Sequence, residues 1–184
     1  MEAPGITRHR RPFYAPLWVT LLAVLVAGGL AFAVHRSATT TVVVLVPSGE
    51  PAPGTIEDPP ISAEGEQRAQ RLARMFGEGG IGRVDGVYVS GERRAQQTAA
   101  PLLDLLHLTP VAYGPKDAAA TAAQLLRAHA GGAVLVIGDG AALQQFLAEL
   151  AGPQTRAVAR DEPDFLYIVS VPTFGRAHVL RLKL

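Results

Sequence analysis

The longest apolar run of the chain lies near its start, at residues 17–34, and contains no charged side chain. Its length is close to the ~20 residues that a helix needs to cross a bilayer. Four basic or histidine residues precede it at 8–11, whereas only His35 and Arg36 follow it. This asymmetry favours a cytoplasmic N-terminus and an exported remainder. We therefore predict a basic cytoplasmic tail and a signal anchor that contacts the membrane through this run, in a single-pass protein of the cell membrane.

The predicted domain boundaries follow from this interpretation of residues 17–34 as a signal anchor. We expect a tail over 1–16, a transmembrane helix over 17–36, a linker over 37–41 and a folded domain over 42–184. A cleaved signal peptide is the alternative, because residues 31–33 (AFA) resemble a cleavage site. In that case the folded domain would be secreted.

Within the folded domain, short β-branched apolar runs alternate with stretches in which apolar residues recur at the helical spacing of i, i+3, i+4 and i+7. The runs predict strands at 42–46, 84–89, 111–113, 133–137, 165–171 and 177–183. The periodic stretches predict helices at 63–76, 92–107, 117–129 and 141–150. Pro101 lies inside the second of these helices and is expected to kink or split it.

The alternation of strands and helices predicts an α/β fold. The runs at 42–46 and 133–137 are apolar throughout, which is typical of parallel strands covered on both faces. In the last strand apolar residues alternate with Arg181 and Lys183, which predicts an antiparallel edge strand with one wet face. The fold class is therefore a three-layer sandwich with a mostly parallel central sheet and an antiparallel edge.

Composition excludes several functions. The net charge of +1 gives no electrostatic case for nucleic acid as a partner. The chain has no cysteine, so disulfides and thiolate chemistry are excluded. Its five histidines show no HxH or HxxxH spacing, and we predict neither a metal site nor a cofactor.

Three segments follow predicted buried strands, at 47–50, 90–94 and 138–140. The carboxyl ends of parallel strands meet at one edge of a sheet, where ligands of open α/β folds bind. The proline-rich segment 51–60 is expected to be a loop that borders the same cleft. Any chemistry of this protein is therefore expected at that edge.

The chain reads ISAEG at 61–65 and SGERRAQQTA at 90–99. These motifs resemble those of the histidine phosphatase superfamily, which has the phosphoglycerate mutase-like fold, and in particular those of its small phosphohistidine phosphatases. The family motif Ser-x-x-x-Arg-Ala-x-x-Thr-Ala is matched in full at 90–99, SGERRAQQTA. The family motif Leu-Thr-x-x-Gly corresponds to ISAEG at 61–65. The order of elements extends the resemblance over 41–184. The resemblance implies this superfamily's fold and a phosphate pocket at the strand ends.

The chain departs from the family pattern at the catalytic positions. The family's first strand ends in Arg-His-Gly-Glu, and this chain has PSGE at 47–50. The resemblance thus places Ser48 at the position of the nucleophilic histidine and Asp139 at that of the second histidine, while Arg94 matches a phosphate-binding arginine. Serine needs a positioned base to act as a nucleophile. A carboxylate repels a phosphate dianion, and phosphoryl transfer needs positive charge around it.

Two hypotheses follow. In the first, the domain is a pseudoenzyme: a non-catalytic binding or scaffold module that holds a phosphate-containing ligand or a protein partner. Its anion site would consist of Arg94, Ser90 and the backbone amides of Ser48 and Gly49. In the second, it is a phosphoric monoester hydrolase with a rebuilt site, in which Ser48 is the nucleophile and Asp139 is the base or a metal ligand.

Several of these residues also have a purely structural interpretation as helix caps. Ser62 is expected to cap the helix at 63–76. Ser90 would cap the helix that follows it, Asp117 the helix over 118–129, and Asp139 the helix over 141–150. For Ser90 and Asp139 the cap and the ligand contact remain open alternatives.

Overall fold

The computed structural model describes residues 17–37, 39–54, 57–77, 83–114, 116–153 and 165–183. The chain divides into two compact units, Met1–Ser37 and Ala38–Leu184. The predicted basic tail over 1–16 lies outside the described residues.

The described part of the first unit is the helix α1 (Leu17–Ser37). Its described side chains are exposed from Trp18 to Phe32, and most of them are apolar. In the described part of the chain, no helix combines the length and the apolarity that crossing a membrane requires. The structure therefore gives the predicted transmembrane helix no support.

The second unit is built on a six-stranded sheet with the order β3-β2-β4-β1-β5-β6. Its strands are β1 (Thr40–Pro47), β2 (Gly86–Ser90), β3 (Val111–Tyr113), β4 (Ala133–Gly138), β5 (Phe165–Pro172) and β6 (His178–Lys183). The first four strands along this order, β3, β2, β4 and β1, are parallel. Strand β5 runs antiparallel to β1, and β6 runs antiparallel to β5. The prediction of a mostly parallel sheet with an antiparallel edge is confirmed.

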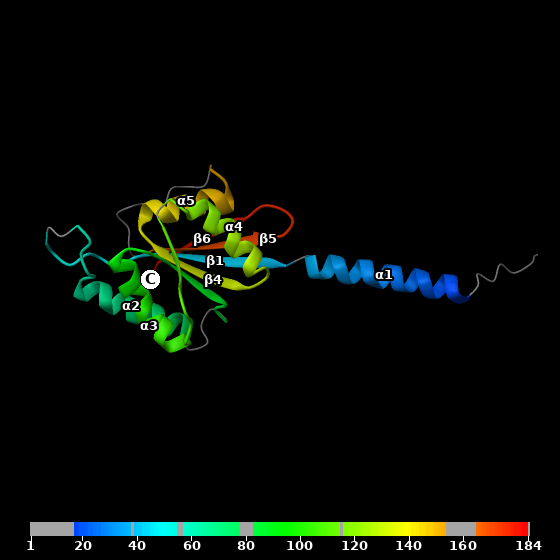
Figure 1. Ribbon diagram of the computed structural model, residues 1–184, viewed down its shortest axis with the longest axis horizontal. Helices are drawn as coiled ribbons and strands as arrows, with labels where there is room; N and C mark the ends of the chain where they lie inside the picture. Colours follow the sequence, from blue (N-terminus) through cyan, green and yellow to red (C-terminus); the bar gives the residue numbers. More distant parts are fainter. Residues whose placement is uncertain are drawn as a thin grey trace, which may run out of the picture. The chain divides into compact units, whose positions relative to one another are not determined.

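Helices cover both faces of this sheet, as Figure 1 shows. They are α2 (Ala63–Gly77), α3 (Arg93–Leu106), α4 (Ala118–Ala128) and α5 (Gly140–Ala151). One apolar cluster joins α2 and α3 to the sheet through residues such as Leu102 and Leu135. A second cluster joins α4 and α5 to the other face through residues such as Phe146 and Val136. The fold is thus the three-layer α/β sandwich that the pattern predicted.

Three details of the helices can be compared with their predictions. Helix α3 continues through Pro101 and is not split there. Ser62 caps α2 as expected, because its hydroxyl accepts a hydrogen bond from the Gly65 amide at 3.1 Å. Asp117 stands at the N-cap position of α4, but its side chain makes no capping hydrogen bond.

The edge strand β6 was expected to have only one wet face. All six of its residues are exposed, including Leu180, which retains 55% of its accessible surface. The buried clusters on the two faces of the sheet contain no residue of β6. The prediction of one covered face was wrong, because alternation along a strand does not determine how far the helix layers extend.

Candidate functional site

The candidate site lies where β1, β2 and β4 end. Pro47 at the end of β1 is level with Gly138 at the end of β4. Val89, one residue before the end of β2, pairs with Ile137 of β4. The three segments that sequence reasoning selected therefore leave the sheet side by side, at its carboxyl edge.

Ser48 is buried at this edge, with 6% of its surface exposed. Its amide donates to the Gly138 carbonyl at 2.9 Å, and its hydroxyl approaches the same carbonyl at 3.3 Å. The hydroxyl proton is thus directed at a backbone acceptor. In the described structure Ser48 extends the sheet by one residue and ties β1 to β4.

The next residue, Gly49, is held from the opposite side. Its amide donates to the Thr98 hydroxyl at 2.8 Å, and that hydroxyl donates to the Arg94 carbonyl at 2.8 Å. A Cβ at this position would lie 3.1 Å from the Cα of Gly65, so the loop and α2 approach closely here. The Gly49 amide, one of the proposed anion donors, already has a partner.

Glu50 anchors the same loop to α2. Its carboxylate lies 3.5 Å from the guanidinium of Arg68, whose side chain is 3% exposed. Its backbone carbonyl accepts from the Ser62 amide at 2.7 Å. A buried arginine is costly without a partner, so this ion pair gives Glu50 a structural role.

Asp139 caps the helix that follows it. Its carboxylate accepts a hydrogen bond from the Ala142 amide at 2.9 Å. This satisfies one of the free amides of the first turn and places negative charge at the positive end of α5. The hydrogen bonds of the described residues join Ser48 to Gly138 and Asp139 to Ala142, and none joins Ser48 to Asp139.

Arg94 is partly buried in the first turn of α3 and pairs with an acid that sequence reasoning missed. Its guanidinium lies 3.7 Å from the carboxylate of Glu92, the N-cap residue of α3. Its Nε is buried and has no hydrogen-bond partner among the described residues. Arg94 is thus partly neutralised, yet it retains one donor without an acceptor.

The surroundings of Arg94 are acidic. Burial raises the pKa of the Glu92 carboxyl, the negative charges of Asp139 and Asp58 raise it further, and Arg94 alone lowers it. Asp58 also accepts from the amide of Arg93, whose side chain is exposed. Glu92, the partner of Arg94, is therefore itself close to two further carboxylates.

Two further residues complete the edge. Ser90 is 5% exposed, and its hydroxyl has no hydrogen-bond partner in the described part of the chain. It does not cap the next helix, since the N-cap of α3 is Glu92. Tyr113 donates from its hydroxyl to the Ile137 carbonyl at 3.2 Å. Burial raises the pKa of this phenol, and the charges of Asp139 and Glu92 raise it as well.

The structure places Ser48, Gly49, Ser90 and Asp139 at the ends of β1, β2 and β4, and Arg94 in the first turn of α3. Sequence reasoning assigned no role to Glu92, Thr98 or Tyr113, which the structure places among them. Glu92 and Thr98 lie inside the matched motif, and that was the only available signal for them. No group of three or more potential metal-ligating side chains is found among the described residues.

Comparison with known proteins agrees with this geometry. The chain matches the profile of the histidine phosphatase superfamily (branch 1) over residues 50–115. The match begins at Glu50, the last residue of the PSGE segment, so Pro47 and Ser48 lie outside it. No curated protein matches the chain.

Solved structures share the fold. The protein histidine phosphatase SixA complexed with tungstate is 20% identical, with a TM-score of 0.65, covering 77% of this chain and 96% of its own. A mycobacterial glucosyl-3-phosphoglycerate phosphatase is 14% identical, with a TM-score of 0.55 and coverages of 71% and 90%. Phosphoglycerate mutase from Plasmodium falciparum is 16% identical, with a TM-score of 0.56 and coverages of 78% and 91%. The family match over residues 50–115 and the shared fold both support the predicted resemblance to the histidine phosphatase superfamily.

Proposed function

We propose that this domain is a non-catalytic member of the superfamily, a binding or scaffold module whose catalytic histidines have been replaced by Ser48 and Asp139. The observation that carries the proposal is that both side chains have structural partners. The Ser48 hydroxyl is directed at the Gly138 carbonyl, and the Asp139 carboxylate caps α5. A nucleophile needs a base within hydrogen-bond reach, and neither contact provides one.

The charge of the edge supports the same proposal. The transition state of phosphoryl transfer carries negative charge that cations or metal ions must stabilise. Here Arg94 is paired with Glu92, and Asp139 and Asp58 add further negative charge close by. The function that we propose for this edge is weak binding of an anion by Arg94, whose Nε has no hydrogen-bond partner among the described residues. Because a fold does not determine a function, the proposal stands on these contacts.

The first prediction is that the purified full chain does not hydrolyse a generic aryl phosphate, with or without Mg²⁺ or Mn²⁺. We expect its rate to equal the buffer rate and to be unchanged in Ser48→Ala and Arg94→Ala. The two variants serve as matched controls, because a contaminating phosphatase would be insensitive to both. Turnover that disappears in Ser48→Ala would instead establish the hydrolase with a rebuilt site, using Ser48 as nucleophile and Asp139 as base.

We also propose that residues 17–34 attach the protein to the membrane, with the domain exported. The support is the uncharged apolar sequence of this stretch, which begins close to the basic residues at 8–11. We expect the full chain to pellet with membranes and to resist alkaline carbonate extraction. A chain that remains in the supernatant at full length would contradict this proposal. A shortened, secreted product would identify a cleaved signal peptide.

A further inference from the structure

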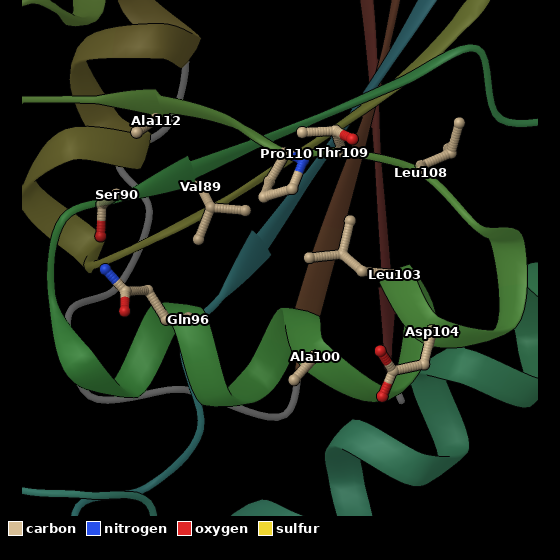
Figure 2. Close-up of a pocket in the computed structure, with 10 residues that line it drawn as sticks. All are labelled: Val89, Ser90, Gln96, Ala100, Leu103, Asp104, Leu108, Thr109, Pro110 and Ala112. Carbon is tan, nitrogen blue, oxygen red and sulfur yellow. The ribbon is translucent and has the colours of Figure 1, made fainter.

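A second hollow lies beside the candidate site, between α3 and the strands β2 and β3 (Figure 2). Its volume of about 440 Å³ is within the range of small-molecule pockets. Most of its lining is apolar: Val89, Ala100, Leu103, Leu108, Pro110 and Ala112. Because β3 is the last strand of the sheet on this side, the hollow opens at a sheet edge. We name it the α3–β3 pocket.

One end of the α3–β3 pocket carries an unsatisfied polar group. Ser90 lines it, and the buried hydroxyl of Ser90 has no hydrogen-bond partner among the described residues. In Figure 2 this hydroxyl points from the end of β2 toward α3 and the side chain of Gln96. The Gln96 amide nitrogen donates to the Gly91 carbonyl at 3.2 Å, which holds the amide at this end. A buried hydroxyl without a partner is destabilising, and a ligand could satisfy it.

The other end of the α3–β3 pocket carries a charge. The exposed side chain of Asp104 lines it and makes no ion pair or hydrogen bond in the described part of the chain. Gln96, Ala100 and Asp104 occupy successive turns on one side of α3, and eight residues of helix span about 12 Å. The pocket therefore has a hydroxyl and an amide at one end, an apolar floor, and a carboxylate about 12 Å away.

We propose that the α3–β3 pocket binds an elongated apolar amine. Its ammonium group would pair with Asp104, its apolar body would cover Ala100 and Leu103, and a hydroxyl at its far end would bond Ser90 and Gln96. The charge of Asp104 selects a cation over an anion. This site is separate from the strand-end site around Arg94, although Ser90 lies at the boundary of both.

The test uses the full chain and three rigid probes of similar length. The amine probe is 4′-(aminomethyl)biphenyl-4-ol, the neutral probe has a methyl group in place of the aminomethyl group, and the anionic probe has a carboxylate there. Isothermal titration should give an affinity for the amine about tenfold higher than for the carboxylate. Equal affinities for the two, or no saturable binding of the amine, would overturn the proposal.

Variants locate the binding. Asp104→Asn should lower the affinity for the amine probe about fivefold and leave the affinity for the neutral probe unchanged. Ala100→Phe, at an exposed helix position, should fill the pocket and weaken all three probes at least tenfold. Glu149→Gln on α5 is the matched charge control and should change nothing. Amine binding that survives Ala100→Phe, or that falls equally in Glu149→Gln and Asp104→Asn, would refute a site in this pocket. Thermal unfolding of each variant confirms that it is folded.

Discussion

Gly138→Ala is expected to destabilise the domain by about 2 kcal/mol, the cost of overpacking a well-filled interior. A Cβ at Gly138 would overlap the hydroxyl oxygen of Tyr113 and would lie 3.4 Å from its Cζ. Tyr113 cannot move away easily, because it is 5% exposed and its ring packs edge-on against Phe146 at 5.2 Å. Urea unfolding of the wild type and of Gly138→Ala measures the difference in their free energies of unfolding.

Removing the hydroxyl should rescue this variant. Tyr113→Phe alone loses the hydrogen bond to the Ile137 carbonyl, which is worth about 1 kcal/mol. In the double variant Gly138→Ala/Tyr113→Phe the new Cβ no longer overlaps a hydroxyl oxygen. The loss of stability of the double variant should therefore be close to that of Tyr113→Phe alone, so the effects of the two substitutions should not be additive. Gly91→Ala is the matched glycine control, because a Cβ there meets nothing within 4 Å. Additive costs in the double variant would show that the Tyr113 hydroxyl is not the obstacle.

Glu92→Gln is expected to raise the affinity of the domain for sulfate about fivefold. The substitution removes the negative charge that lies 3.7 Å from the Arg94 guanidinium. A full Coulomb gain is not expected, because both side chains are partly exposed and water screens the pair. Sulfate is the suitable probe because its charge does not change between pH 4 and 8. Isothermal titration or competition with a chromophoric anion gives the affinities.

The pH dependence adds a second measurement. Because the pKa of Glu92 is raised, the carboxylate takes up its proton at a higher pH than an ordinary glutamate. The wild-type affinity for sulfate should therefore rise as the pH falls through that raised pKa, and Glu92→Gln should show a smaller rise. Combined with Glu92→Gln, Asp139→Asn should raise the affinity for sulfate further. It should also keep the cap of α5, since asparagine is a good N-cap residue.

Arg94→Ala controls for binding elsewhere on the surface. We expect it to abolish the gain that Glu92→Gln produces. If sulfate affinity is the same in wild type, Glu92→Gln and Arg94→Ala, the strand ends do not bind anions, and the scaffold role would rest on protein partners alone.

The fold could be predicted from sequence because its signals are local. The apolar runs of β1 and β4 and the helical stripe of α5 depend on neighbouring residues only. The caps by Ser62 and Asp139 act over three residues, so each was expected from its position before a helix. The motif at 90–99 indicated the family resemblance because its spacing is continuous in the chain.

The charge pairing in the candidate site could not be predicted in the same way. Glu92 is two residues from Arg94, and residues at this spacing do not face each other within a helix. They pair because Glu92 is the N-cap residue and lies in extended conformation outside α3. The charge of Asp139 reaches Glu92 only because β2 and β4 are neighbours in the sheet.

The sequence by itself determined the α/β order and the three strand-end segments, because each is a property of consecutive residues. Only the tertiary structure decided that Ser48 bonds Gly138, that Gly49 bonds Thr98 and that Arg94 is surrounded by acids. The first contact joins residues that are 90 positions apart in the sequence, and the second joins residues that are 49 apart. The order of the strands brings such segments together, and no single stretch of the chain determines that order.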